Sequence, residues 1–247
     1  MIKILLVMNS SKIVVIFGAG ASVELGGVNK NPPLGRDFFK ELSLVYTESW
    51  GKISGEIAEN FIPDFEKGME LLYYQDLEKR QYNIAGLLRD MTMFFSKYKI
   101  ENFETNLYAK FIKKFKKYLY DKSIVLASLN YECLIENALY YNEMIPVYCG
   151  DGEGSKLLKI HGSCNFVPQG FYGGGTGMTL NIDLATINCP IKSCHPNDIE
   201  NQFNNIPIPA AMSIYMANKK NIIAPAGIKE IQDEFKKNIN SAKIIII

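Results

Sequence analysis

The sequence has few of the features that draw a protein to nucleic acid or into a membrane. Its 247 residues carry a formal net charge of +1, so no overall field attracts a polyanion, and we expect no nucleic-acid partner. No run approaches the ~18 consecutive apolar residues that a membrane-spanning helix needs, so we expect no membrane partner either. Histidine is scarce too, with two in the chain. Chemistry that relies on imidazole therefore has two positions to use.

The cysteines do not fit a disulfide framework. There are five, at Cys133, Cys149, Cys164, Cys189 and Cys194. An odd number in a chain of this size, with no recognisable secretory signal, favours reduced thiols and a cytoplasmic location. Residues 1–8 hold one lysine and a short apolar stretch, too little for a signal peptide. We expect a short extra strand or a leader there.

Apolar runs alternate with helical patterns along the chain. A continuous apolar run predicts a buried strand at 12–17, and further strands are predicted at 123–129, 156–160 and 243–247, with candidates at 178–182 and 221–224. Residues 131–141 and 228–239 have helical spacing, and so has most of 36–120. Residues 164–205 are rich in Gly, Asn, Pro and Cys and predict a loop excursion. The pattern predicts one α/β domain over 1–247, a doubly wound Rossmann-like parallel sheet with a helical subdomain inserted at about 36–120.

Three predicted strands end in polar or glycine-bearing motifs. GAGAS occupies 18–22 after the first strand, Asn130 follows the second, and His161 with Gly162 follows the third. Ligands of parallel α/β sheets bind at the carboxyl ends of the strands. The glycines let a backbone approach a pyrophosphate, and an imidazole can exchange a proton near neutral pH. The three motifs together predict a nucleotide site at one sheet edge.

Each motif has a simpler explanation when taken alone. GAGAS could be a tight strand-to-helix turn without a ligand, since Val23 stands where a full dinucleotide fingerprint has its third glycine. Asn130 could be the N-cap of a helix that begins near Tyr131. A lone histidine is more often structural than catalytic, and these alternatives remain open at this point.

The three motifs in order resemble those of one family. IFGAGAS, SLNYE and KIHGS are similar to the GAG-x-S, T-x-N-x-D and K-x-HG motifs at the NAD site of SIR2-like proteins, and NIIAP and AKIIII resemble that family's later strands. The resemblance implies NAD-binding roles for some residues and catalytic roles for others. The cofactor-binding residues would be Gly18, Ala19, Gly20, Ser22, Ser128 and Glu132, and the catalytic residues Asn130 and His161.

The resemblance also implies what each residue does. Gly18 to Gly20 would pack against the pyrophosphate and ribose, with Ser22 at a helix start near the phosphates. Asn130 would hold the nicotinamide ribose and a water, and His161 would contact the ribose hydroxyls as general base. Glu132 stands where the family usually has Asp, and Ser128 where it has Thr.

The same comparison separates the reactions of the family. Its protein deacylases carry a zinc ribbon of two C-x-x-C pairs, whereas here Cys189, Cys194 and His195 follow Cys164 at poor spacing. We expect no metal. The chain is more similar to the prokaryotic SIR2-like NAD+ hydrolases, several of which act in antiphage defence. The leading hypothesis is an NAD+ glycohydrolase, with NAD as substrate and nicotinamide and ADP-ribose as products. A non-catalytic NAD or ADP-ribose sensor is the alternative, and an NAD-dependent deacylase the third.

The remaining predictions concern a basic cluster and the assembly of the protein. Five lysines between 110 and 117 lie opposite an apolar stripe and predict a solvated helix face. The last predicted strand, 243–247, ends where the family usually continues into a ligand-contacting loop. We therefore expect part of the adenosine pocket to be missing, in a fragment of a longer protein or in a degenerate one. A homo-oligomer, or a further domain in a longer protein, is the expected assembly.

Overall fold

The structure is a computed structural model that describes residues 4–6, 12–53, 55–79, 82–169, 189–204, 208–213 and 226–247. The chain divides into two units. The sheet unit comprises Met1–Pro32, Tyr98–Ser163 and Gly227–Ile247, and the helical unit comprises Pro33–Lys97 and Cys164–Ala226. Each unit is described by itself below.

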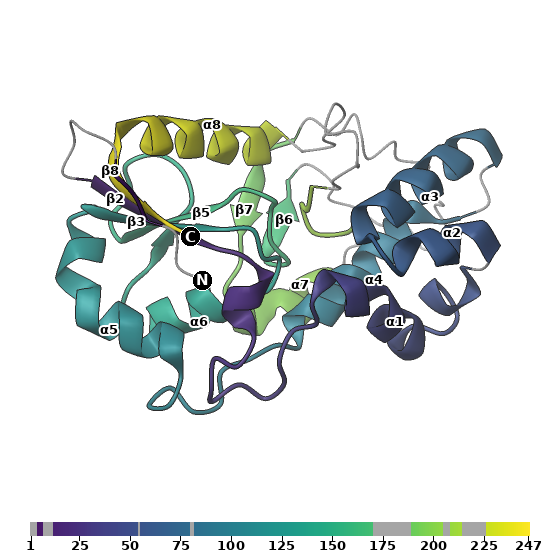
Figure 1. Cartoon of the computed structure of the whole chain (residues 1–247), viewed down its shortest axis with the longest axis horizontal. Helices are drawn as coiled ribbons and strands as arrows, with labels where there is room; N and C mark the ends of the chain where they lie inside the picture. Colours follow the sequence, from purple (N-terminus) through teal and green to yellow (C-terminus); the bar gives the residue numbers. More distant parts are fainter. Residues whose placement is uncertain are drawn as a thin grey trace. The chain divides into compact units, whose positions relative to one another are not determined.

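A six-stranded sheet is the centre of the sheet unit (Figure 1). Its order is β1 (Ile4–Leu6), β8 (Ala242–Ile246), β2 (Lys12–Phe17), β3 (Ile124–Ser128), β5 (Ser155–Lys159) and β4 (Pro146–Val147). The five strands from β8 to β4 run parallel, and β1 pairs antiparallel with β8. Every residue of β3 and β5 is buried, as in strands inside a parallel sheet, and in β5 this includes Lys156 and Lys159.

Helices lie on both faces of this sheet. In Figure 1, α8 (Ala226–Ser241) covers one face, and α5 (Leu107–Tyr120) and α6 (Leu134–Tyr141) cover the other. This arrangement confirms the predicted α/β, Rossmann-like fold. It also confirms the predicted strands at 12–17, 123–129, 156–160 and 243–247 and the short extra strand within 1–8. The two-residue β4 was not predicted, because two residues carry no periodic signal.

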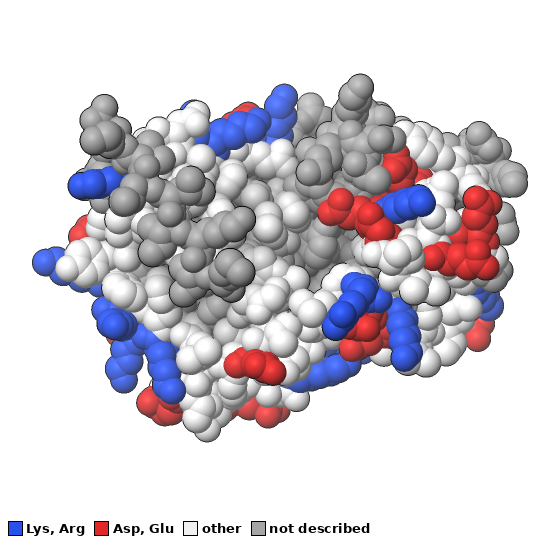
Figure 2. All heavy atoms as spheres, in the orientation of Figure 1, with Lys and Arg blue, Asp and Glu red and all other residues white. Residues whose placement is uncertain are grey.

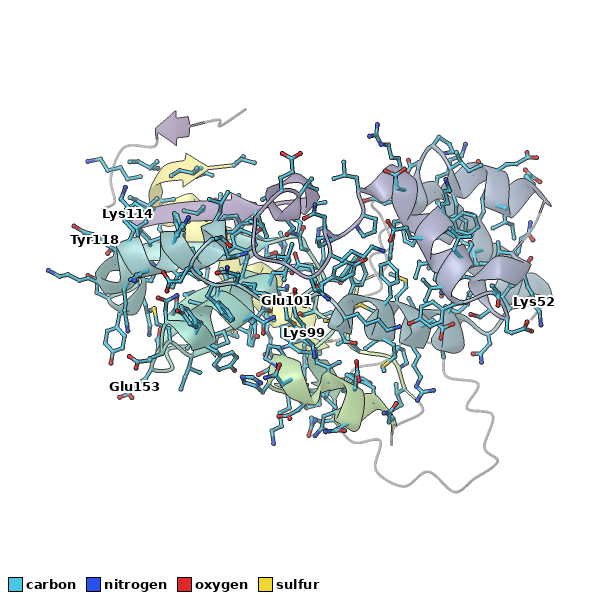
Figure 3. The ribbon with its side chains drawn as sticks, turned by 90° about the horizontal axis from the view of Figure 1, so that it is seen from below. Lys52, Lys99, Glu101, Lys114, Tyr118 and Glu153 are labelled. Carbon is cyan, nitrogen blue, oxygen red and sulfur yellow. The ribbon has the colours of Figure 1, made fainter. Side chains whose placement is uncertain are left out.

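The basic cluster lies on the outer face of α5. Tyr108, Ala109, Ile112 and Leu119 are buried on the inner face. The five lysines between 110 and 117 are exposed, and basic side chains gather over this helix in Figure 2. Lys114 and Tyr118 extend outward from it in Figure 3. A solvated helix face accounts for this pattern, as the sequence predicts.

The helical unit begins between β2 and β3, where helices were predicted. It contains α1 (Gly35–Val45), η2 (Trp50–Lys52), α2 (Gly55–Phe61), α3 (Phe65–Lys79) and α4 (Ile84–Ser96). Trp50 and Phe61 are fully buried, and the rings of Phe39 and Phe61 stack 4.5 Å apart. These aromatic contacts form the core of the unit. The helical region between the strands is therefore confirmed, although α5 within the expected 36–120 insert packs against β3 and β5 of the sheet unit.

The helical unit continues after β5. Its described part contains β6 (Phe166–Pro168), β7 (Ile191–Ser193), η3 (Pro196–Asp198) and α7 (Ile199–Asn204). β6 and β7 pair antiparallel, and Arg89 Nη2 donates to Phe203 O at 2.8 Å, which joins α4 to α7. The expected loop excursion is thus partly a two-stranded ribbon and a short helix. The strand candidates at 178–182 and 221–224 lie outside the described residues.

Membrane spans were sought in the described part of the chain. None of its helices combines the length and the apolar character that crossing a bilayer requires.

Candidate functional site

The GAGAS motif forms a single tight turn after β2. Gly18 is extended (φ −103°, ψ −177°), and Ala19–Ser22 make one turn of 3₁₀ helix that Ala21 N closes on Gly18 O at 2.9 Å. Val23 returns to an extended conformation. The helix expected after the glycines is thus one short turn, and Ser22 ends it where it was expected to stand at a helix start. Ala19 and Gly20 are exposed, while Ser22 is buried. The exposed backbone of 18–20 can approach a ligand.

The loop after the turn is held to the segment that leads into α5. Gly26 and Gly27 have positive φ (70° and 61°), Val28 bridges Ile100, and Glu101 N donates to Gly27 O at 2.7 Å. Figure 3 labels Glu101 beside this loop. A Cβ on Gly27 would lie 2.0 Å from Asn102 O. This stretch therefore has a defined conformation that depends on glycine.

Asn130 connects the end of β3 to the GAGAS turn. Its Nδ2 donates to Gly18 O at 3.1 Å, to Ser22 Oγ at 2.8 Å and to Glu132 Oε1 at 3.1 Å. Three acceptors around Nδ2 determine the orientation of the amide. The carbonyl oxygen Oδ1 therefore points away from them, and the described residues offer it no hydrogen bond. Asn130 is 8% exposed, so this oxygen is the part of the side chain that a ligand can use.

The helix-capping explanation for Asn130 is wrong. α6 begins at Leu134, three residues later than expected, and its N-cap is Cys133. The first helical N–H, on Leu134, is taken by Glu132 Oε2 at 2.9 Å. The capping role thus belongs to Glu132, and the amide of Asn130 is free of it.

Glu132 accepts hydrogen bonds from the polar groups around it. Its Oε1 accepts from Ser22 Oγ at 2.6 Å and from Asn130 Nδ2, while Oε2 accepts from Leu134 N. The residue is 2% exposed. A carboxylate that accepts three internal hydrogen bonds has little capacity left for a ligand. Glu132 thus lies among the predicted site residues and bonds to protein groups.

Tyr108 belongs to the same network but carries no sequence signal. Its hydroxyl lies 3.1 Å from Ser22 Oγ, and since Ser22 donates its proton to Glu132, Tyr108 is the donor. Burial, followed by the charge of Glu132, raises the pKa of Tyr108, which keeps its proton in place. Tyr108 lies outside the stripe that apolar spacing predicts on this helix, and nothing in the sequence relates it to Ser22, 86 positions away.

Ser128 fixes the backbone ahead of Asn130. Ser128 is the last residue of β3 and is fully buried, and its Oγ accepts from Asn130 N at 3.1 Å. By the motif resemblance, Ser128 stands where a threonine hydroxyl would be. Its own hydroxyl bonds to the protein backbone.

His161 follows β5, the neighbour of β3. Ile160 N donates to Ser128 O at 3.2 Å, so the segment that carries His161 is bonded to the end of the strand before Asn130. Burial lowers the pKa of His161 to about 4, opposed by a backbone hydrogen bond with Leu129 and reinforced by the charge of Lys159. The Tyr131 ring lies 6.3 Å from the imidazole, centroid to centroid. At neutral pH the imidazole is therefore uncharged and able to accept a proton.

Of the cysteines after KIHGS, Cys164 and Cys194 lie near each other: burial, followed by the charge of Cys164, raises the pKa of Cys194 to about 12. The ribbon register places Cys194 opposite Asn165, with Cys194 N donating to Asn165 O at 2.9 Å, whereas Cys189 lies beyond the other end of the paired residues. The Nδ1 atom of His195 accepts from Asn197 N at 3.2 Å. Nowhere in the described ranges do three or more His, Cys, Asp or Glu side chains group as metal ligands would.

The arrangement has three chemical capacities. Its exposed glycine backbone can face a phosphate, the amide oxygen of Asn130 can accept from a hydroxyl or a water, and the neutral His161 can take a proton. These groups follow β2, β3 and β5, which are neighbours in the sheet. Comparison with known protein families finds no family that matches the chain, and comparison with curated proteins finds no match either.

Proposed function

We propose that this chain is an NAD+ glycohydrolase of the SIR2-like type. The observation that carries the proposal is the meeting of Gly18, Ser22 and Asn130 in one hydrogen-bonded network, with His161 just after β5, the next strand of the sheet. These are the positions that the motif resemblance assigns to the NAD site. Parallel α/β sheets bind nucleotides at this edge, which supports the same assignment.

The proposed reaction converts NAD+ and water to nicotinamide, ADP-ribose and a proton. The bond between nicotinamide and the ribose anomeric carbon breaks with its electron pair leaving on nicotinamide, and positive charge develops on the ribose. Nicotinamide leaves as a neutral molecule, so no strong acid is needed. Water then forms the new bond to the anomeric carbon, and its proton passes to solvent directly or through His161.

The residues fit a reaction that depends on orientation. Asn130 Oδ1 would accept from a ribose hydroxyl or from the attacking water, and its direction is fixed by the bonds of Nδ2 to Gly18 and Ser22. His161, with a pKa lowered to about 4 by burial, is a weak base that stays unprotonated. Such a base can order the ribose hydroxyls, and orientation can supply much of the rate in such a step.

The direct test is to incubate the purified chain with NAD+ and to measure free nicotinamide. Asn130→Ala and His161→Ala should each lower the rate by at least about 100-fold, as expected when orienting groups are lost. His195→Ala and Asn197→Ala change the same residue types in the helical unit and should leave the rate unchanged. Equal rates in wild type, Asn130→Ala and His161→Ala would overturn the assigned roles.

A non-catalytic sensor of NAD or ADP-ribose is the second candidate. The observation that favours it is that Ser22, Asn130 Nδ2 and Glu132 hydrogen-bond to one another. Side chains held in this way form a fixed surface on which a ligand can bind. Calorimetric titration with NAD+ and with ADP-ribose separates the candidates, because tight binding of both without release of nicotinamide supports the sensor. Zinc-dependent deacylation is third, and metal analysis of the purified protein tests it. Assembly as a homo-oligomer or with a further domain stays a prediction that light scattering of the purified chain would test.

A further inference from the structure

Lys159 and Glu136 form a fully buried ion pair. Lys159 is the last residue of β5 and Glu136 lies in the first turn of α6. Lys159 Nζ is 3.4 Å from Glu136 Oε1, and both side chains are 0% exposed. Removing two charges from water is costly, and apolar residues of the same size often serve stability as well or better. The pair therefore calls for a reason other than stability.

The pair is also incompletely satisfied. Glu136 Oε1 accepts a long hydrogen bond from Tyr148 OH at 3.4 Å, but Glu136 Oε2 is buried without a hydrogen-bond partner among the described residues. Burial raises the pKa of Glu136, the charge of Lys159 lowers it, and the charge of Glu132 raises it further. A pair selected for stability alone would not leave a carboxylate oxygen in this state.

Lys159 also bonds to a backbone carbonyl of the candidate site. Its Nζ donates to the carbonyl oxygen of Glu132 at 2.5 Å. Lys159 is the register partner of Ser128, so the side chain reaches from the end of β5 to the loop that follows β3. That loop carries Asn130, and His161 is two positions after Lys159 in sequence. One ammonium group thus links the segments that carry both proposed catalytic residues.

We infer that Lys159, oriented by Glu136, is a positioning residue of the candidate site. By holding the carbonyl of Glu132, it keeps the loop of Asn130 in register with the segment of His161. The carboxylate of Glu132 then stays where Asn130 Nδ2 and Ser22 Oγ can donate to it. The role in catalysis rests on the proposed function, whereas the role in holding Asn130 does not.

Replacing both charges separates this role from a structural one. In Lys159→Met with Glu136→Leu, apolar groups of similar size fill the space, and a purely structural pair should be replaceable in this way. The positioning bond to Glu132 is lost all the same. We expect a folded protein in which the loop of Asn130 is less firmly held.

The chain offers a matched control on the same strand. Lys156 Nζ lies 2.8 Å from Glu234 Oε1 and also donates to a backbone carbonyl, that of Gly150. This pair is near the start of β5, away from the strand ends that carry the motifs. Lys156→Met with Glu234→Leu therefore removes the same kind of interaction without touching the proposed site.

The first measurement needs no ligand. Hydrogen exchange of the Asn130 side-chain amide is followed by NMR, with the resonance assigned by its loss in Asn130→Ala. We expect exchange at least about tenfold faster in the Lys159/Glu136 double variant, because local opening becomes easier, and wild-type exchange in the Lys156/Glu234 variant. Wild-type protection in a folded Lys159/Glu136 variant would overturn the inference. If that variant does not fold, Lys159→Met alone gives the same test, since burial favours the neutral, protonated form of Glu136.

The second measurement is the rate of nicotinamide release. We expect kcat to fall about 10- to 100-fold in the Lys159/Glu136 variant while KM changes less than about threefold, since misplacement affects the transition state most. The Lys156/Glu234 variant should keep the wild-type kcat. An unchanged kcat in the former would contradict the role in catalysis. If the wild-type chain releases no nicotinamide, the proposed function fails while the exchange measurement still decides the positioning role.

Discussion

Asn130 Nδ2 lies 2.8 Å from Ser22 Oγ and donates to it, across 108 positions of sequence. The bond joins the end of β3 to the turn after β2, and Ser22 Oγ in turn donates a hydrogen bond to Glu132 Oε1 at 2.6 Å. Two strand ends are therefore connected by a buried chain of donors and acceptors in which each member orients the next. Changes to one member should be felt by the others.

Ser22→Ala should destabilise the chain more than an ordinary serine replacement does. It removes the acceptor of Asn130 and of Tyr108 and one donor to Glu132, all of which are buried side chains. We expect the free energy of unfolding to fall by about 1–3 kcal/mol. Urea denaturation measures this, with Ser241→Ala as control. Ser241 is exposed and its Oγ donates to Asn238 O within α8, so its loss should lower the free energy of unfolding by about 0.5 kcal/mol or less. Equal losses in the two variants would contradict the network.

Glu132→Gln tests whether the site needs an acceptor on both oxygens. Oε1 receives Ser22 and Asn130, and Oε2 receives Leu134 N, so either orientation of the glutamine amide sets its NH₂ against a donor. We expect a loss of about 1–3 kcal/mol in the free energy of unfolding. Glu143→Gln, on an exposed side chain paired with Lys116, is the control and should change it by less than about 1 kcal/mol. A stable, wild-type-like Glu132→Gln would show that one oxygen suffices.

The sheet could be predicted because its signal is local. The runs that became β2 and β3 are largely apolar on both sides, the pattern of a strand inside a parallel sheet, and the run that became β5 has two leucines between its lysines. The convergence of 18–22, Asn130 and His161 followed from strand order in a parallel sheet. The structure keeps that order, with β3 between β2 and β5.

The contacts that build the site could not be predicted from local patterns. Tyr108 and Glu136 have the spacing of ordinary helix residues, and their partners are distant in sequence. The turn at Ala19–Ser22 was expected to open a helix because glycines often precede one. Here the extended Val23 and the positive φ of Glu24 (59°) end it after one turn. Lys159 was part of the KIHGS motif, but its partners Glu132 and Glu136 depend on the start of α6, which lies three residues later than the sequence indicated.

Gly27→Ala should disrupt the loop between the GAGAS turn and α1. Its φ is +61°, and the added Cβ would lie 2.0 Å from Asn102 O. Left-handed backbone at a residue other than glycine costs about 1 kcal/mol or more, and the clash adds to it, so we expect a loss of at least about 2 kcal/mol in unfolding free energy. Gly35→Ala is the control, since no described atom lies within 4 Å of a Cβ there and alanine favours the helix it begins. If Gly27→Ala were as stable as Gly35→Ala, the loop would have to be able to rearrange.

His161 should make stability fall in acid over a defined pH window. Burial lowers its pKa from 6.5 to about 4. Between these two pH values, His161 is therefore protonated in the unfolded chain and neutral in the folded chain. The contribution is present above pH 6.5 and is lost as the pH falls through about 4, by about 3 kcal/mol in total. Carboxyl groups titrate in the same range, so the informative quantity is the difference between wild type and His161→Asn, measured by urea denaturation at each pH. That difference should shrink by about 3 kcal/mol from pH 7 to pH 4. A difference that stays constant with pH would mean that His161 is protonated as readily in the folded chain as in the unfolded one, and a neutral proton acceptor at the end of β5 would then be lost from the proposed reaction at mildly acidic pH.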